Sequence, residues 1–128
     1  MLVYCTICCK EKKTNKEPID SINRYISNRI KFVFEKSQKD SAEFRILSGK
    51  YGLLKPNDKI PWYDKKLEFS DISALKKIVK KQILKQNICK IVFFGKDKKK
   101  NPDWEPYYNL IENACSELGV DLQIMMYY

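Results

Sequence analysis

The chain has 128 residues, of which 44% are hydrophobic and 32% are charged. This length suits one domain with one hydrophobic core, and the composition excludes intrinsic disorder, so residues 1–128 are expected to form a single α/β domain. The absence of histidine excludes Ser-His-Asp and Cys-His catalysis and metal sites that depend on imidazole. Lys and Arg outnumber Asp and Glu by 25 to 16, a net charge of +9. This balance favours anionic partners such as nucleotides or nucleic acid, although a lysine-rich composition without function gives the same number.

Location and redox state follow from the apolar runs and the cysteines. No apolar run approaches the roughly 20 residues that cross a bilayer, and the opening segment reaches Lys10 too soon for a signal peptide. The five cysteines are an odd number without the spacing of a disulfide scaffold. We therefore expect a cytoplasmic protein with reduced thiols, no membrane partner, no metal and no cofactor. The oligomeric state stays open.

The first half of the chain predicts two strands joined by a helix. Residues 2–8 form a short apolar run typical of a buried strand, and a polar loop follows it. Apolar residues then recur every three or four positions from Ile19 to Val33, which predicts a helix from Pro18 to about Lys36. Residues 44–47 are a second strand. The following segment, with its glycines, prolines and aromatics, is expected to be a structured loop.

The second half predicts two more helices and two more strands. Apolar positions from Ile72 to Ile83 keep helical spacing behind a cap at Ser70 or Asp71. Residues 88–94 are the most strand-like run, and they should form a central strand. A third helical stripe ends at Gly119, and residues 120–127 form a last strand.

Strands that alternate with helices predict a parallel sheet with both faces covered. We therefore expect a three-layer α/β/α sandwich with a four-stranded, mostly parallel sheet. Ligands of such sheets bind beyond the carboxyl ends of the strands. Lysines are frequent in the segments after three of the predicted strands: Lys10, Lys12, Lys13 and Lys16, then Lys50, Lys55 and Lys59, and then Lys96, Lys98, Lys99 and Lys100.

The segment Ser48-Gly49-Lys50-Tyr51-Gly52 has the composition of an anion-binding loop. Its glycines allow backbone N–H groups to turn toward a phosphate, while Lys50 adds charge and Tyr51 a stacking face. The spacing matches neither a Walker loop nor a dinucleotide fingerprint. A purely structural turn explains the same residues equally well.

The run Leu47-Ser48-Gly49-Lys50-Tyr51-Gly52-Leu53-Leu54-Lys55-Pro56, followed by Ile60-Pro61-Trp62-Tyr63-Asp64, resembles a signature of the YaaA peroxide-stress family. It is closer to a short uncharacterised bacterial and phage domain family that carries the same motif. The resemblance extends to Cys8-Cys9-Lys10, and more loosely to Gly95 and Tyr107. It implies a uracil-DNA-glycosylase-like α/β/α fold, which also occurs in proteins that handle modified nucleobases.

Asp64 is the carboxylate with the clearest catalytic potential because it follows a rigid Pro-Trp-Tyr segment. Cleavage of a nucleobase C–N bond passes through a cation-like sugar, which a carboxylate stabilises. The alternative is that Asp64 caps a turn or pairs with a lysine. We take Asp64 and Tyr51 as candidate catalytic residues. The candidates for binding substrate or phosphate are Cys9, Lys10, Ser48, Gly49, Lys50, Gly52, Tyr63, Gly95 and Lys96.

Two functions remain open at this point. One is a nucleotide- or nucleobase-handling enzyme, such as a hydrolase or transferase that acts on an N-glycosidic or related linkage. The other is a non-catalytic module that binds a nucleotide or nucleic acid in a stress-response or phage-related system.

Overall fold

A five-stranded sheet forms the centre of the protein, in a computed structural model that describes residues 1–127. The strand order is β4-β3-β1-β6-β7. β1 pairs with β3 and β6 in parallel, β6 pairs with β7 in parallel, and β4 alone runs antiparallel to its neighbour. The strands are β1 (Leu2–Ile7), β3 (Glu43–Ser48), β4 (Gly52–Leu54), β6 (Lys90–Gly95) and β7 (Asp121–Met126).

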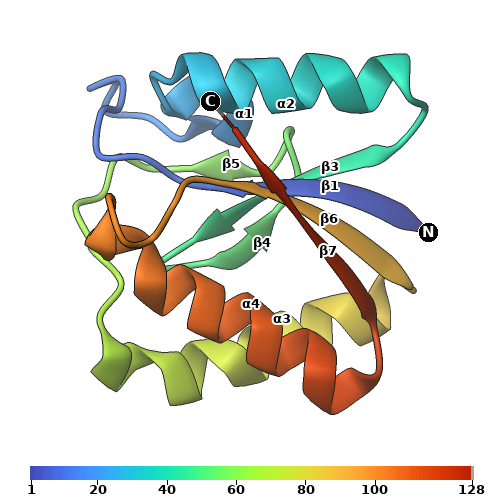
Figure 1. The fold of residues 1–128 in the computed structure, drawn as a ribbon. Helices are drawn as coiled ribbons and strands as arrows, with labels where there is room; N and C mark the ends of the chain where they lie inside the picture. The colour runs from blue at the N-terminus through green and yellow to red at the C-terminus, as the bar shows by residue number, and fades with distance from the viewer. Residues whose placement is uncertain (128) are drawn as a thin grey trace.

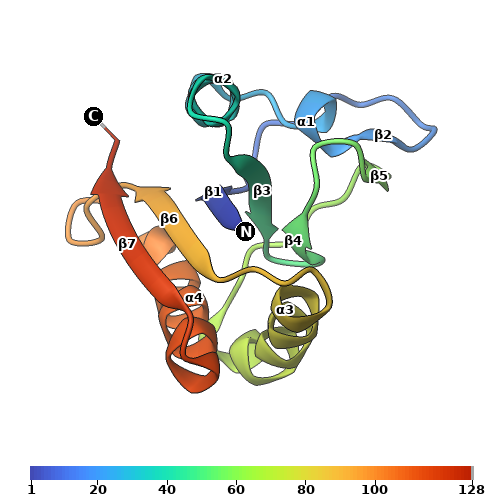
Figure 2. The same cartoon turned by 90° about the vertical axis from the view of Figure 1, so that its right-hand side faces the viewer.

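Helices cover both faces of this sheet (Figures 1 and 2). α2 lies on one face over β1 and β3, and α3 and α4 pack together on the opposite face. A small antiparallel pair, β2 with β5, lies outside the main sheet. These elements are β2 (Ile19–Asp20), α1 (Ser21–Arg24), α2 (Asn28–Lys39), β5 (Lys59–Ile60), α3 (Ile72–Lys85) and α4 (Glu105–Leu118), with short 3-10 turns at Phe69–Asp71 and Pro102–Trp104.

Most predicted elements are present. The four expected strands correspond to β1, β3, β6 and β7, and all of them are parallel. The apolar stripe of α3 is buried at the expected positions, because Ile72, Leu75, Val79 and Ile83 face the core. α4 ends at Gly119, which has a φ of 68° and adopts the left-handed conformation that favours glycine. The mixed α/β class and the mostly parallel sheet are therefore confirmed.

The expected number of four strands is wrong, because the segment after Ser48 adds a fifth. Gly52 has a φ of 74°, which lets the chain reverse, and Leu53 then pairs with Leu47. The Leu53 N–H donates to Gln82 Oε1 of α3 at 2.7 Å. A run of three residues is too short to show strand periodicity, so only its pairing with β3 in the folded chain reveals β4.

The single helix expected from Pro18 to Lys36 is also wrong. Ile19 pairs with Ile60 in a strand, and the chain is extended at Tyr25, between α1 and α2. Ile26, which the helical stripe placed in the core, is 53% exposed, whereas Tyr25 is 2% exposed. Burial of Tyr25 and of its neighbour Arg24 turns the chain inward at this point and interrupts the helix.

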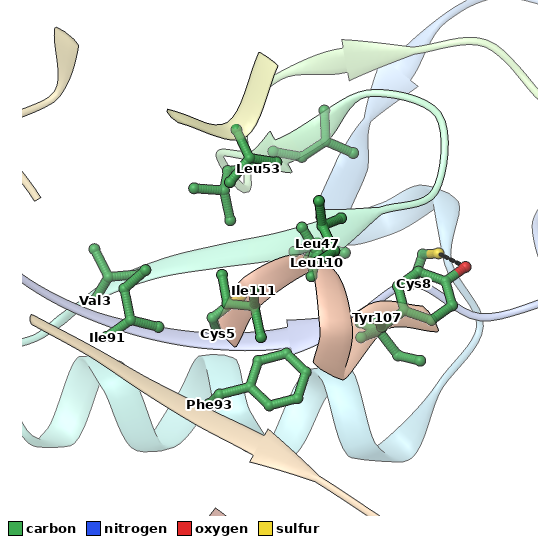
Figure 3. Packing of buried hydrophobic residues seen from close by; sticks show 14 of the residues in the cluster. Val3, Cys5, Cys8, Leu47, Leu53, Ile91, Phe93, Tyr107, Leu110 and Ile111 are labelled. Atoms are coloured by element: carbon green, nitrogen blue, oxygen red, sulfur yellow. Dashed lines mark hydrogen bonds between the residues drawn. The ribbon is translucent and has the colours of Figure 1, made fainter. Parts of the chain in front are cut away.

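The core lies on both faces of β1, the central strand. On one face, Val3 and Cys5 of β1 and Phe93 of β6 belong to the buried cluster that includes Leu110 and Ile111 of α4 (Figure 3). Among the residues described, no helix is both long enough and apolar enough to cross a bilayer.

The two central strands lead to opposite faces of the sheet. β1 leads to helices on one face, and its neighbour β6 leads to α4 on the other. The carboxyl ends of β1 and β6 therefore flank the switch point at which open α/β sheets bind ligands.

Candidate functional site

A pocket of about 540 Å³ opens at this switch point. Its walls come from four parts of the chain that are distant in sequence. They are residues 7–10 and 12 at and after the end of β1, Arg29 of α2, residues 64–66 of the loop before α3, and residues 103, 104 and 107 around the start of α4. The size is that of a small-molecule site.

Arg29 is the most unusual group in this pocket. Its Nη1 donates to Thr6 Oγ1 at 2.5 Å and to the Ile7 carbonyl at 2.9 Å, and its guanidinium carbon lies 4.8 Å from the centre of the Trp104 ring. The residue is only 9% exposed. Burial lowers the pKa of Arg29 from its usual value, but a guanidinium remains charged in proteins. Within residues 1–127, no carboxylate forms an ion pair with it.

Local sequence places Arg29 at this position. Ser27 caps α2, because its side chain accepts a hydrogen bond from the Ile30 N–H at 3.1 Å, and Arg29 lies in the first turn that follows. Thr6 is fully buried in β1 and donates its hydroxyl proton to the Phe94 carbonyl at 2.7 Å. Its oxygen therefore points a lone pair at Arg29, which holds the guanidinium at the pocket wall.

Four lysines add positive charge around the same pocket: Lys10, Lys12, Lys65 and Lys66. Lys66 pairs with Asp103 at 2.8 Å across the pocket, and Lys65 pairs with Asp71 at 2.9 Å. Lys12 forms no ion pair within the described chain, and its Nζ lies 4.7 Å from the centre of the Tyr63 ring. The pocket is therefore cationic, with exposed Asp64 and Asp103 at its edge.

A buried cluster of hydroxyl and thiol groups lies directly beside the pocket. The Cys8 thiol and the Tyr107 hydroxyl are 3.5 Å apart (Figure 3). The Tyr63 hydroxyl bonds to Ser48 Oγ at 2.9 Å and to the Tyr25 hydroxyl. Burial is the main reason that the pKa values of all three tyrosines are raised, and the neighbouring Cys8 adds to the effect. These tyrosines are neutral at physiological pH. Their hydrogen bonds join the segment after β1 to α4, and the segment between α1 and α2 to the end of β3.

Three of the residues selected from sequence line the pocket: Cys9, Lys10 and Asp64. Cys9 is half-buried, and its thiol donates to the Glu11 carbonyl at 3.1 Å. Burial raises the pKa of Cys9, which favours the neutral thiol. Lys10 and Asp64 are exposed and are available to a ligand.

The structure gives Ser48 and Gly49 internal roles. Ser48 is fully buried, and its Oγ accepts the N–H groups of Lys50 and Tyr51, each at 3.1 Å. A methyl group on Gly49 would lie 3.0 Å from the Tyr107 hydroxyl and 3.2 Å from the Leu67 backbone nitrogen. These contacts match the structural turn that sequence left open as the alternative to an anion-binding loop.

The aromatic and lysine candidates of this motif lie beside the pocket, and none of them lines it. Tyr63 is 4% exposed, and the half-buried Tyr51 meets it edge-on at 5.4 Å. Lys50 Nζ lies 5.4 Å from the Tyr51 ring centre and 5.8 Å from that of Tyr63. Lys55 and Lys59 follow the reversal at β4, so they do not share the edge formed by the carboxyl ends of the parallel strands.

Gly52, Gly95 and Lys96 also do not line the pocket. Gly52 begins β4. Gly95 ends β6, next to Lys96, whose carbonyl accepts the Tyr108 hydroxyl at 2.8 Å. Gly95 and Lys96 therefore both contact Tyr108 of α4 at the end of β6.

Sequence reasoning missed Arg29 and Trp104, two buried residues of the pocket wall. One signal was present, because the chain contains 22 lysines and only three arginines. An arginine in such a composition marks a position at which lysine does not suffice, since only arginine offers a planar group with five donors.

Comparison with known proteins assigns the chain to a family whose activity is unknown. Residues 3–99 match the model of a family described as "Family of unknown function (DUF6884)", which covers more than half of the chain. The chain belongs to this family. No curated protein and no solved structure matches it.

Proposed function

We propose that this member of the DUF6884 family binds a nucleotide, or a related phosphorylated nucleobase compound, in the pocket between β1 and β6, and that it acts there on an N-glycosidic linkage. The observation that carries the proposal is Arg29, a buried cation at the pocket wall without a carboxylate partner among residues 1–127. A buried charge is costly unless a counter-charge or hydrogen bonds satisfy it. A bound phosphate supplies both.

The remaining groups of the pocket support a ligand with an anionic end and a polar body. Lys10 and Lys12 can add to the charge that Arg29 presents. Asp64 and Asp103 offer acceptors for hydroxyl or amino groups, as a sugar and a base carry. A volume of about 540 Å³ lies within the range of roughly 300–1,000 Å³ that small-molecule pockets occupy.

A hydrolytic step at this site assigns a role to Asp64. Hydrolysis breaks the bond between the sugar C1′ and the base nitrogen, the oxygen of water bonds to C1′, and a proton from water ends on the base. The Asp64 carboxylate would stabilise the positive charge on the sugar and orient the water. The expected relationship to the uracil-DNA-glycosylase-like three-layer fold and the cytoplasmic location remain parts of the proposal.

Binding is tested by replacing Arg29 with glutamine. Because a hydrogen bond to a charged group contributes about 1.5–3 kcal/mol, the dissociation constant for nucleoside 5′-monophosphates should rise about 10- to 100-fold in isothermal titration calorimetry. Arg45→Gln is the matched control, since Arg45 is also an arginine buried at 3% exposure and it does not line the pocket. That variant should lose stability and keep its affinity.

Two results would contradict the nucleotide site. One is equal affinity of the wild type and the folded Arg29→Gln variant. The other is retention of DNA or RNA oligonucleotides, with an affinity that falls steeply with salt, in the absence of mononucleotide binding. The second result would favour the non-catalytic nucleic-acid-binding module.

Catalysis is tested separately with Asp64→Asn, which keeps the shape of the side chain and removes its charge. Release of free base from a panel of nucleosides, nucleotides and short DNA strands should fall by about 100-fold or more, while the dissociation constant stays nearly unchanged. Asp103→Asn is the comparison, because that carboxylate lies at the same rim but pairs with Lys66, and this variant should change the dissociation constant more than the turnover. Equal turnover of wild type and Asp64→Asn would remove Asp64 from the mechanism.

A further inference from the structure

β7 is an outer strand of the main sheet with one edge free in the described chain. It is six residues long, and its only charged residue is Asp121 at its first position. Natural edge strands are normally protected by charges, proline or a bulge, and residues 122–126 contain no charge and no proline. The opposite edge differs, because β4 is only three residues long and is held by α3.

The backbone of β7 shows which residues face the free edge. The N–H of Asp121 donates to the Cys89 carbonyl at 3.3 Å, and the N–H of Tyr127 donates to the Gly95 carbonyl at 2.8 Å. Alternate residues of a strand direct their backbone groups to opposite sides. Odd-numbered residues of β7 therefore bond to β6, and Leu122, Ile124 and Met126 direct their N–H and C=O groups outward.

We propose that this edge binds a second copy of the same chain, with the two β7 strands antiparallel and related by a two-fold axis at Ile124. The three residues with outward backbone groups are placed symmetrically about Ile124. Leu122 of one copy then pairs with Met126 of the other, and Ile124 pairs with its own equivalent. Each of these is a hydrogen-bonded pair, so the outward groups of all three residues are satisfied and the two sheets become continuous.

The side chains around β7 also suit this partner. On the α4 face, Leu122, Ile124 and Met126 line a groove of about 440 Å³ together with Tyr108, and the paired copy would bring its own apolar row beside it. On the other face, Phe32 is 49% exposed and Met125 is 39% exposed. Apolar side chains therefore flank the free edge on both faces.

Charge complementarity favours the antiparallel arrangement. It brings Asp121, at the start of β7 in one copy, to the end of β7 in the other copy. Lys98 and Lys99 line the groove at that end together with Asp97, and residues 96–100 carry four lysines and one aspartate, so this end has a net positive charge. A parallel arrangement would instead place the two Asp121 carboxylates together.

Analytical ultracentrifugation provides the first test. The weight-average mass of the wild type should rise with concentration toward twice the mass of the chain. Ile124→Pro removes an N–H that no hydrogen bond within the described chain uses, so the fold tolerates it and the central pair is lost. This variant should stay monomeric, whereas Leu84→Lys, at a 63% exposed site on α3, should dimerise like the wild type.

Cross-linking tests the register of the two β7 strands, and it also tests the dimer if Ile124→Pro fails to fold. The proposed register places Gln123 of one copy directly opposite Met125 of the other, in a closely spaced pair that is not hydrogen-bonded. In a Cys89→Ser background, an oxidised mixture of Gln123→Cys and Met125→Cys chains should form the mixed disulfide in preference to either homodimer. A wild type that is monomeric at all concentrations, a dimeric Ile124→Pro protein, or unselective cross-linking would each overturn the proposal.

Discussion

Arginine and lysine occupy different places in this protein. All three arginines are buried, at 0% exposure for Arg24, 9% for Arg29 and 3% for Arg45, whereas the lysines lie on the surface or are half-buried. Arg24 has no carboxylate partner among the residues that the structure describes, and it donates to four backbone carbonyls, which join the segment before α1 to β5. In the same part of the chain Arg29 also lacks a carboxylate, but it donates to just one carbonyl and one hydroxyl there. Because of this difference, we assign a structural role to Arg24 and propose that Arg29 binds the ligand.

The buried tyrosines make the protein sensitive to alkali. Burial raises the pKa values of Tyr25, Tyr63 and Tyr107 above the ordinary value of 10.0. Groups of this kind contribute stability that is fully present below the unfolded pKa and is lost as the pH rises above it, because the unfolded chain then releases protons that the folded chain retains. Above about pH 10, each such tyrosine should reduce the free energy of unfolding by up to about 1.4 kcal/mol per pH unit.

Urea unfolding between pH 8 and pH 11 measures this loss. The Tyr25→Phe variant serves as the comparison, because it removes one of the three titrating groups and leaves the bond between Tyr63 and Ser48 in place. Its stability should fall less steeply with pH than that of the wild type. A stability that stays constant from pH 9 to pH 11 would show that these hydroxyls are not buried.

At the scale of elements, the segment between β1 and α2 departs most from simple periodicity. Ile19, Ile22 and Ile26 continue the apolar stripe of α2 backward in sequence, yet the chain there forms β2, a single helical turn and an extended link. Ser27 then starts α2 as its N-cap. The position of this cap decides where Arg29 lies, because it sets the first turn of the helix at the pocket wall.

Replacing the cap tests this dependence. Ser27→Ala should lower the free energy of unfolding by about 1 kcal/mol, because the Ile30 N–H loses its acceptor. It should also weaken nucleotide binding by a small factor through Arg29. Ser27→Asp, which can accept the same hydrogen bond, should restore both the urea midpoint and the affinity. Failure of this rescue would show that the cap does not position the site.

At the scale of the whole molecule, the parallel sheet brings the segments that line the pocket together. The carboxyl ends of β1 and β6 meet at one edge, and their following segments diverge to opposite faces. This divergence leaves space that side chains from α2 and from the start of α4 line. The free edge of β7 lies at the side of the sheet rather than at this carboxyl edge. Antiparallel pairing through β7 would therefore leave both pockets of a dimer open.

The sequence by itself determined the α/β class, the four parallel strands, α3, α4 and the glycine that ends α4. These features follow from local apolar periodicity, which reports the face of an element that is buried. It also placed Cys9 and Lys10 at the carboxyl edge, because parallel strands bring their ends together, and it selected Asp64 from its rigid loop. The tertiary structure alone decided the break before α2, the short strand β4 and the inward roles of Ser48 and Gly49. It also brought Arg29 between Thr6 and Trp104. Each of these depends on contacts between residues far apart in the chain, and local periodicity carries no information about such contacts.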